Sequence, residues 1–260
     1  MANTTALITG ASSGIGAEFA RVLASDGMDL VLVARRAERL EDLKKEIEQG
    51  SNVSCRMIAM DLSRPEAPDE LYRATQSRGW SVDWLINNAG FGTNGAFATL
   101  PLDREREEIR LNVATLVALC RLYLPEMIGR RRGQIINLGS IGSFTPSPYM
   151  ATYSATKAYV LSFSEALATE LVGTGVNVLA LCPGATRTEF QKVAGVRGIP
   201  DSQFMSAEEV VRQAIAAAKA NKRLLIPGWM NKVAAASTRL MPLALIARIA
   251  GSMLRPKSPA

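Results

Sequence analysis

The sequence predicts an α/β fold in which a parallel sheet of about seven strands carries helices on both faces. Three observations lead to this prediction. Short apolar runs recur along the whole chain, helical stretches separate them, and several runs are rich in Val and Ile, as in strands buried on both faces. The 260 residues, 48% of them hydrophobic, suit one domain with a large core, although this length also allows two small domains.

Seven apolar runs are the predicted strands, and they alternate with helical stretches. The strands comprise residues 5–9, 29–34, 53–59, 82–87, 134–138, 176–181 and 223–226. The helices comprise residues 15–25, 37–49, 65–77, 103–128, 150–172 and 207–220. Because strand and helix alternate, the connections should be right-handed crossovers, and the sheet should be doubly wound and Rossmann-like.

Residues suited to binding or catalysis follow the first six strands directly. They are Gly10, Arg35, Asp61, Asn88, Ala89, Gly90, Ser140, Pro183 and Gly184. In doubly wound sheets ligands bind outside the carboxyl ends of the strands. We therefore expect these residues to lie together at one site.

The turn after the first strand is rich in glycine. It reads Thr9-Gly10-Ala11-Ser12-Ser13-Gly14-Ile15-Gly16. At such a turn the bare backbone can approach a pyrophosphate, and the N-terminus of the following helix can face its negative charge. The spacing indicates a dinucleotide site, and an ordinary tight turn is the alternative.

The end of the second strand indicates which dinucleotide is bound. NAD-specific sites usually place an Asp or Glu there, on the ribose hydroxyl. This chain has Arg35 and Arg36 instead. Arg35 could bind an adenosine 2′-phosphate through charge-assisted hydrogen bonds of about 1.5–3 kcal/mol each, which favours NADP over NAD. In the alternative, both arginines only begin an exposed helix.

Tyr153 and Lys157 are four residues apart in a predicted helix and so share one face, with Ser140 thirteen residues upstream of Tyr153. A tyrosine that works near neutral pH needs its pKa lowered by about 3 units, or about 4 kcal/mol. A unit charge about 4 Å away supplies about that much at an effective dielectric constant of about 20. We therefore expect Lys157 to lower the pKa of Tyr153 and make it a proton donor or acceptor. The alternative is that both only share a helix surface.

The composition excludes several classes of enzyme. The chain has no histidine, and its three cysteines, Cys55, Cys120 and Cys182, are far apart. Ser-His-Asp and Cys-His nucleophile systems are thereby excluded, as is a histidine ligand for zinc. We expect no metal site and no nucleic-acid partner.

These segments closely resemble the short-chain dehydrogenase/reductase superfamily, in its single-domain branch. The family's Asn-Asn-Ala-Gly motif matches residues 87–90, and its catalytic set matches Asn112, Ser140, Tyr153 and Lys157. The resemblance covers residues 4 to about 228. It implies that Ser140 orients a carbonyl oxygen, Tyr153 supplies a proton and Lys157 holds the nicotinamide ribose.

The resemblance also implies a set of cofactor-binding residues. They are Gly10, Ser12, Ser13, Gly14, Ile15, Gly16, Arg35, Arg36, Asp61, Leu62, Asn88, Ala89, Gly90, Tyr153, Lys157, Pro183, Gly184, Thr186 and Thr188. Asn112 interrupts an otherwise apolar helical run, where a water leading to Lys157 would satisfy its amide. The alternative is an asparagine that is bonded only to backbone.

The expected function is NADPH-dependent reduction of a hydrophobic ketone or aldehyde, of the 3-oxoacyl or steroid type, to an alcohol. An oxidative NADP-dependent alcohol dehydrogenase and a non-catalytic NADP-sensing protein are the alternatives. Three segments that follow the catalytic strand ends should form the substrate pocket. Their apolar residues are Phe91, Phe97, Phe144, Met150, Phe190 and Met205.

The expected division is a catalytic domain over residues 1–228 and an extension over residues 229–260. No Asp or Glu follows Glu209, whereas residues 210–260 contain nine Lys and Arg. Apolar positions with helical spacing in the extension are Leu243, Ile246, Ala247, Ala250, Met253 and Leu254. We expect this basic amphipathic helix to pack on its own domain or on a partner subunit, with an anionic membrane surface as the alternative.

The helix is too short to span a bilayer. We expect the protein to be cytoplasmic and to form a homo-dimer or homo-tetramer.

Overall fold

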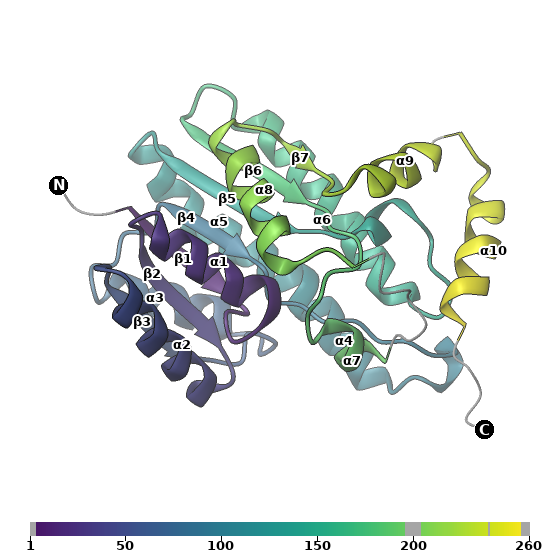
Figure 1. Cartoon of the computed structure of the whole chain (residues 1–260), viewed down its shortest axis with the longest axis horizontal. Helices are drawn as coiled ribbons and strands as arrows, with labels where there is room; N and C mark the ends of the chain where they lie inside the picture. Colours follow the sequence, from purple (N-terminus) through teal and green to yellow (C-terminus); the bar gives the residue numbers. More distant parts are fainter. Residues whose placement is uncertain (1–3, 196–203, 239, 256–260) are drawn as a thin grey trace.

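Within residues 4–195, 204–238 and 240–255, which the computed structural model describes, seven strands form one parallel sheet (Figure 1). The strands are β1 (Thr5–Thr9), β2 (Asp29–Ala34), β3 (Cys55–Ala59), β4 (Trp84–Asn87), β5 (Gly133–Leu138), β6 (Val176–Leu181) and β7 (Leu224–Leu225). Their order in the sheet is β3-β2-β1-β4-β5-β6-β7. The winding reverses between β1 and β4, and such a switch point is where doubly wound sheets open a crevice for ligands.

The predicted strands are confirmed, but β3 and β4 begin two residues later than expected. Pairing with β2 starts at Cys55, opposite Leu30. Before β4, the Asp83 carboxylate accepts the Thr5 N–H at 3.1 Å, while the Asp83 N–H donates to the Thr5 carbonyl at 2.9 Å. The Asp83 carboxylate therefore accepts a hydrogen bond that a strand carbonyl would otherwise accept, and the regular pairing of β4 begins after it.

Helices cover both faces of the sheet (Figure 1). They are α1 (Gly14–Ser25), α2 (Ala37–Gly50), α3 (Ala67–Gln76), α4 (Leu102–Ile109), α5 (Leu116–Gly129), α6 (Ala151–Glu170), α7 (Phe190–Ala194), α8 (Ala207–Lys219), α9 (Trp229–Ser237) and α10 (Leu243–Leu254). Alternate strand residues enter two cores: Ile8 and Leu32 pack with α1, α2 and α8, whereas Leu7 and Val31 pack with α3, α5 and α6. Both strand faces are thus apolar, which explains the near-continuous hydrophobic runs of the sequence.

The single helix predicted over residues 103–128 runs without a break but changes type in its middle. A π-helical segment, η2 (Arg110–Thr115), joins α4 to α5 and carries Asn112. Single π-turns inside α-helices are frequent at functional sites. Among the described residues, the continuous helix Leu102–Gly129 is also the one that is long and apolar enough to cross a membrane. Its α5 part packs on β4, β5 and α3, as a core helix does.

Beyond β7, α9 and α10 lie at the end of the molecule near the loops that follow β4 and β5 (Figure 1). The Asn94 side chain donates to the Leu254 carbonyl at 3.2 Å, and Gly251 packs against Pro148. Ile246 is buried, but Leu243 and Met253 are exposed. Only part of the apolar face expected for α10 is therefore buried, because the helix contacts the domain along one narrow strip.

Candidate active site

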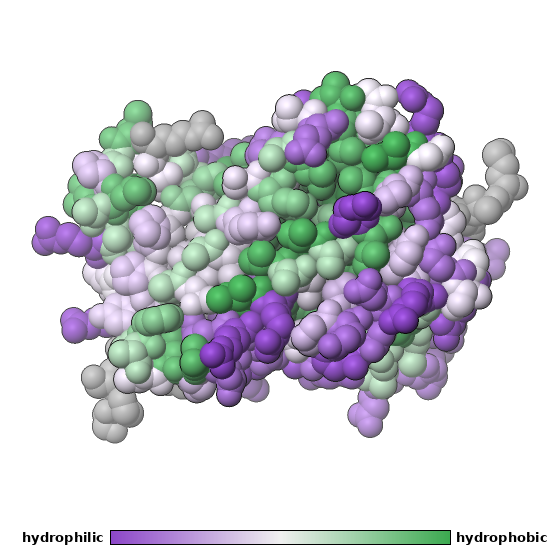
Figure 2. Space-filling view, turned by 180° about the vertical axis from the view of Figure 1, so that it is seen from behind, coloured by the Kyte–Doolittle hydropathy of each residue, from purple (hydrophilic) through white to green (hydrophobic). Residues whose placement is uncertain are grey.

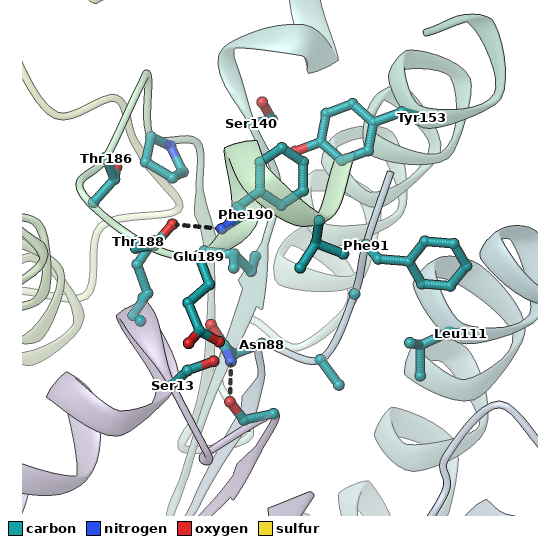
Figure 3. Close-up of a pocket in the computed structure, with 18 of the residues that line it drawn as sticks. Ser13, Asn88, Phe91, Leu111, Ser140, Tyr153, Thr186, Thr188, Glu189 and Phe190 are labelled. Atoms are coloured by element: carbon teal, nitrogen blue, oxygen red, sulfur yellow. Dashed lines mark hydrogen bonds between the residues drawn. The ribbon is translucent and has the colours of Figure 1, made fainter. Parts of the chain in front are cut away.

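One cavity of about 480 Å³ opens at the carboxyl ends of the strands (Figure 3). Predicted residues that line it are Gly10, Ser12, Ser13, Gly14, Ile15, Arg35, Arg36, Asp61, Leu62, Asn88, Ala89, Gly90, Ser140, Tyr153, Lys157, Pro183, Gly184, Thr186 and Thr188. Gly16 and Asn112 do not line it. The structure thus brings together residues that are as far apart in the sequence as Gly10 and Thr188.

The glycine-rich turn packs too tightly for side chains. Gly10 has φ +68° and Gly14 has φ +56°, a left-handed region that favours glycine. A Cβ on Gly16 would lie 2.4 Å from the Gly10 carbonyl oxygen. Gly16 therefore lets α1 begin directly against the turn, and bare backbone faces the cavity at Gly10 and Gly14.

Asn88 ties the end of β4 to this turn. Its Nδ2 donates to the Thr9 carbonyl at 2.8 Å and to the Gly10 carbonyl at 3.2 Å (Figure 3). The Thr9 hydroxyl in turn accepts the Asn88 and Ala89 N–H groups, both at 3.0 Å. These bonds fix the two sides of the switch point relative to each other.

Arg35 lies at the cavity after β2. Its side chain is 60% exposed, and its Nη1 lies 3.6 Å from Glu107 Oε1. Asp61, the next predicted residue along this edge, accepts the Ser63 N–H and hydroxyl at 3.0 Å and 2.8 Å. Arg35 is therefore an accessible cation at one end of the cavity.

Arg36 binds an anion within the protein itself. Its Nη2 donates to Ser13 Oγ at 2.8 Å and to Ser12 Oγ at 3.1 Å, and its Nη1 lies 3.0 Å from Glu189 Oε2. Hydrogen bonds from Arg39 and Arg36 hold the pKa of Glu189 at about 2. Figure 3 shows the Glu189 carboxylate beside Ser13. This corner of the cavity thus accommodates a negative charge, and the sequence did not single out Glu189.

Tyr153 reaches the cavity from the first turn of α6, and its hydroxyl points toward Ser140 (Figure 3). The Phe190 ring lies 5.2 Å from the Tyr153 ring, centroid to centroid. Burial raises the pKa of Tyr153 to about 12, although its hydrogen bond with the Ser140 side chain acts in the opposite direction. The phenol is therefore fully protonated at neutral pH.

Lys157 lies one helical turn after Tyr153, as expected. Its Nζ donates to the Leu138 carbonyl at 2.6 Å and lies 5.8 Å from the centroid of the Tyr153 ring. Burial lowers the pKa of Lys157 to about 8. The expectation that Lys157 lowers the pKa of Tyr153 is wrong for this structure, because the ammonium is directed at a carbonyl and burial of the phenol dominates.

Asn112 is buried behind the cavity wall. Its Oδ1 accepts the Phe91 N–H at 3.1 Å, and its Nδ2 donates to the Phe91 carbonyl at 2.9 Å and to the Thr156 hydroxyl at 3.1 Å. Backbone and a hydroxyl thus satisfy both ends of the amide, so the alternative of an asparagine that is bonded only to backbone is wrong, while the water that leads to Lys157 stays a prediction. Asn112 holds the strand-end loop against α6, and its catalytic role stays a prediction.

Three of the six residues expected in the substrate pocket line the cavity: Phe91, Met150 and Phe190. The other three, Phe97, Phe144 and Met205, do not. Phe97 is 65% exposed on a short 3₁₀ helix, and Met205 packs against the core of the α1 face. An aromatic residue in the right segment is therefore not enough to predict a pocket wall, because loop geometry decides which side chains turn inward.

Sequence reasoning also missed residues of the cavity wall. Leu254 enters from α10, while Met60, directly after β3, and Leu111 of η2 flank the strand ends. The helical spacing of apolar residues predicted that Leu254 belongs to the apolar side of the terminal helix. No neighbouring residue in the sequence indicated that it lines the cavity. Among the described residues no cluster of three or more metal-ligating side chains occurs, and all three cysteines are free and buried.

Comparisons with known proteins agree with this geometry. A model of the short chain dehydrogenase family matches residues 4–196. A very-long-chain 3-oxoacyl-CoA reductase from Phaeosphaeria nodorum is 37% identical over 194 residues, or 73% of this chain and 57% of that reductase, so the chain spans little more than half its length.

Two solved structures match nearly end to end. A short-chain dehydrogenase from Sphingobium yanoikuyae in complex with NADPH has a TM-score of 0.82 at 33% identity, covering 99% of this chain and 98% of that one. A bulky-bulky ketone specific alcohol dehydrogenase from Comamonas testosteroni has a TM-score of 0.78 at 31% identity, covering 99% and 97%.

Proposed function

Since the chain belongs to the short-chain dehydrogenase family and is an oxidoreductase, we propose that it uses NADPH to reduce a hydrophobic ketone or aldehyde to an alcohol. One observation carries the proposal. A fully protonated Tyr153 meets Ser140 at the apolar end of a cavity whose other end offers bare backbone and arginines.

The residues at the cavity fit a dinucleotide. Backbone at Gly10 and Gly14 leaves room for phosphates, and a Cβ on Gly14 would come 3.0 Å from Thr188. When bound, the reduced nicotinamide supplies a hydride. NADPH rather than NADH is proposed because Arg35 and Arg36 stand where an acid would favour NAD.

The chain's own residues supply the proton and the orientation. A substrate carbonyl oxygen between Ser140 and Tyr153 would accept hydrogen bonds from both hydroxyls. As negative charge develops on that oxygen, the Tyr153 hydroxyl donates its proton, which makes it the general acid. A pKa of about 12 keeps this proton in place at neutral pH.

The substrate end of the cavity is apolar. Phe91, Met150, Phe190, Val193 and Leu254 contribute to its wall. This composition supports a hydrophobic substrate, as do the names of the 3-oxoacyl-CoA reductase and the bulky-bulky ketone specific dehydrogenase. A 3-oxoacyl thioester or a steroid-like ketone would suit such a wall.

Deleting residues 241–260 should raise KM for a hydrophobic ketone by about 5-fold to 100-fold, as expected for loss of one partly buried apolar wall residue, Leu254. The Kd for NADPH should stay within about twofold, since the glycine turn and Arg35 lie elsewhere in the cavity. Steady-state kinetics and a fluorescence titration measure the two constants. An unchanged KM would remove α10 from the substrate site.

Assembly into a homo-dimer or homo-tetramer is also proposed. The outer face of the layer formed by α3, α5 and α6 shows apolar residues gathered across its middle (Figure 2). Ile128 on α5 and Tyr159 on α6 are large apolar side chains with more than a third of their surface exposed. Such a face supports contact between subunits. Light scattering measures the mass in solution.

The test of the proposed function is a turnover screen that follows NADPH absorbance with aldehydes, bulky ketones and 3-oxoacyl thioesters. We expect turnover with at least one hydrophobic carbonyl compound and slower turnover with NADH. The Tyr153→Phe variant controls for contaminating reductases. Tight NADPH binding without turnover of any carbonyl would favour the NADP-sensing alternative.

A further inference from the structure

Two carboxylates are buried behind the catalytic helix. Glu105 and Glu108 lie on the inner side of α4 and are 5% and 0% exposed. They face Thr93, in the loop after β4, and Thr152, at the start of α6 beside Tyr153. Acidic side chains are almost never fully buried without partners that compensate the cost.

The hydrogen bonds of this cluster are one proton short if both carboxylates are charged. The Thr93 hydroxyl lies 2.7 Å from Glu105 Oε1 and 3.1 Å from Glu108 Oε2, but it has one hydrogen to donate. The shorter contact and a hydroxyl from Thr152 satisfy Glu105. The second contact of Thr93 is then satisfied if Glu108 donates to it. Glu108 is the fully buried one of the two acids, which favours it as the carrier of the missing proton.

The remaining atoms of Glu108 agree with a neutral acid. Its Oε2 also accepts the Thr93 N–H at 3.0 Å, which a protonated oxygen can still do. Its Oε1 is buried and has no hydrogen-bond partner among the described residues. An orphan oxygen costs much more on a carboxylate than on an uncharged acid.

Three titratable groups influence Glu108: Glu105 from the same helix, and Lys157 and Tyr153 from α6. Burial raises the pKa of Glu108 to about 7, and Glu105 adds to the rise while Lys157 opposes it. Burial lowers the pKa of Lys157, whereas Cys182, directly after β6, and Glu108 both raise it. Glu108 and Lys157 therefore each stabilise the charge of the other.

We propose that Glu108 is a positioning residue that holds a proton in the resting site and, once ionised, becomes the buried counter-charge that keeps Lys157 protonated above neutral pH. Because Lys157 belongs to the same site, this role rests on the proposed function. Its consequence is a wider pH range over which the ammonium of Lys157 persists next to Tyr153.

The protonation of Glu108 can be tested without turnover. An acid whose pKa is about 7 when folded and about 4.3 when unfolded contributes stability that is present below the unfolded pKa and lost as pH rises through 7. Glu108→Gln cannot lose a proton. The Tm of this variant minus that of the wild type should therefore become more positive between pH 5 and pH 8.

Asp103→Asn, an almost fully exposed acid on the same helix, is the matched control and should show a constant Tm difference. A constant difference for Glu108→Gln would overturn the proposal. Should that variant not fold, carboxyl carbon-13 NMR of glutamate-labelled wild-type protein decides instead. One glutamate titrating near pH 7 is expected, and titration of all glutamates below pH 6 would overturn the proposal.

The coupling to Lys157 is tested by the pH profile of kcat/KM with NADPH and a reducible ketone. In the wild type the rate should fall as Lys157 loses its proton near pH 8. In Glu108→Gln this fall in kcat/KM should occur at a pH lower by about one unit, which lowers kcat/KM at pH 8 by up to about tenfold. At pH 6 the value should stay within about twofold of the wild type. A fall at the same pH as in the wild type would contradict the counter-charge role. If no carbonyl is reduced at all, the proposed function fails, while the Tm and NMR results on Glu108 still stand.

Discussion

Tyr153→Phe is expected to lower kcat for carbonyl reduction by about 10²-fold to 10⁴-fold, the usual contribution of a positioned general acid. The variant removes one oxygen atom, and the ring keeps its packing against Phe190 and Gly92. The Kd for NADPH should stay within about twofold, because the hydroxyl is directed at Ser140 and the substrate position. A loss confined to kcat is the signature of an interaction made in the transition state.

The measurement is single-turnover reduction with saturating NADPH, together with a binding titration. Tyr159→Phe is the matched control, since it makes the same change on the same helix at an exposed position. The control should retain wild-type rates. Residual activity above about one tenth in Tyr153→Phe would show that another group donates the proton.

Arg35→Ala is expected to raise the Kd for NADPH by about tenfold to 100-fold, which corresponds to one charge-assisted bond of about 1.5–3 kcal/mol to the 2′-phosphate. The Kd for NADH should change by less than about threefold, since NADH has no phosphate there. Arg35 lines the cavity, and its contact with Glu107 at 3.6 Å is too long to hold it elsewhere.

Arg106→Ala is the matched control, because its side chain is 60% exposed like that of Arg35 and the variant removes the same charge from the surface. It should leave both dissociation constants unchanged at physiological salt. An equal rise in the Kd for NADPH and for NADH in Arg35→Ala would show that Arg35 does not contact the 2′-phosphate. Tighter binding of NADH than NADPH by the wild type would contradict the cofactor assignment outright.

The fold was predictable because its signals are local. Apolar runs such as that of β2 are buried on both faces, and their alternation with helices fixes a parallel, doubly wound sheet. The strand ends then place Gly10, Asn88 and Ser140 at one edge, whatever the details of the loops. The π-helical segment at Asn112 was not predictable, because one polar residue in an apolar helical run does not by itself indicate a change of helix type.

The protonation states in the site were harder to predict than the residues that form it. Spacing placed Lys157 beside Tyr153, but burial of both groups, which sequence does not report, reversed the expected pKa shift of the phenol. Contacts between distant parts of the sequence were equally hidden. Leu254 and Phe91 line the same cavity although more than a hundred residues separate them in the sequence. Glu108 resembled any solvent-facing acid of an amphipathic helix until its burial was known.

The central claim is hydride transfer from NADPH to a hydrophobic carbonyl carbon with a proton from Tyr153. Its most direct test uses NADPH that carries deuterium at the transferable position of nicotinamide C4, a ketone or 3-oxoacyl thioester from the screen, and mass spectrometry of the alcohol. The account predicts an alcohol with deuterium on its carbinol carbon from the wild type, and essentially none from Tyr153→Phe. An alcohol formed without deuterium, or equal product from the variant, would contradict it.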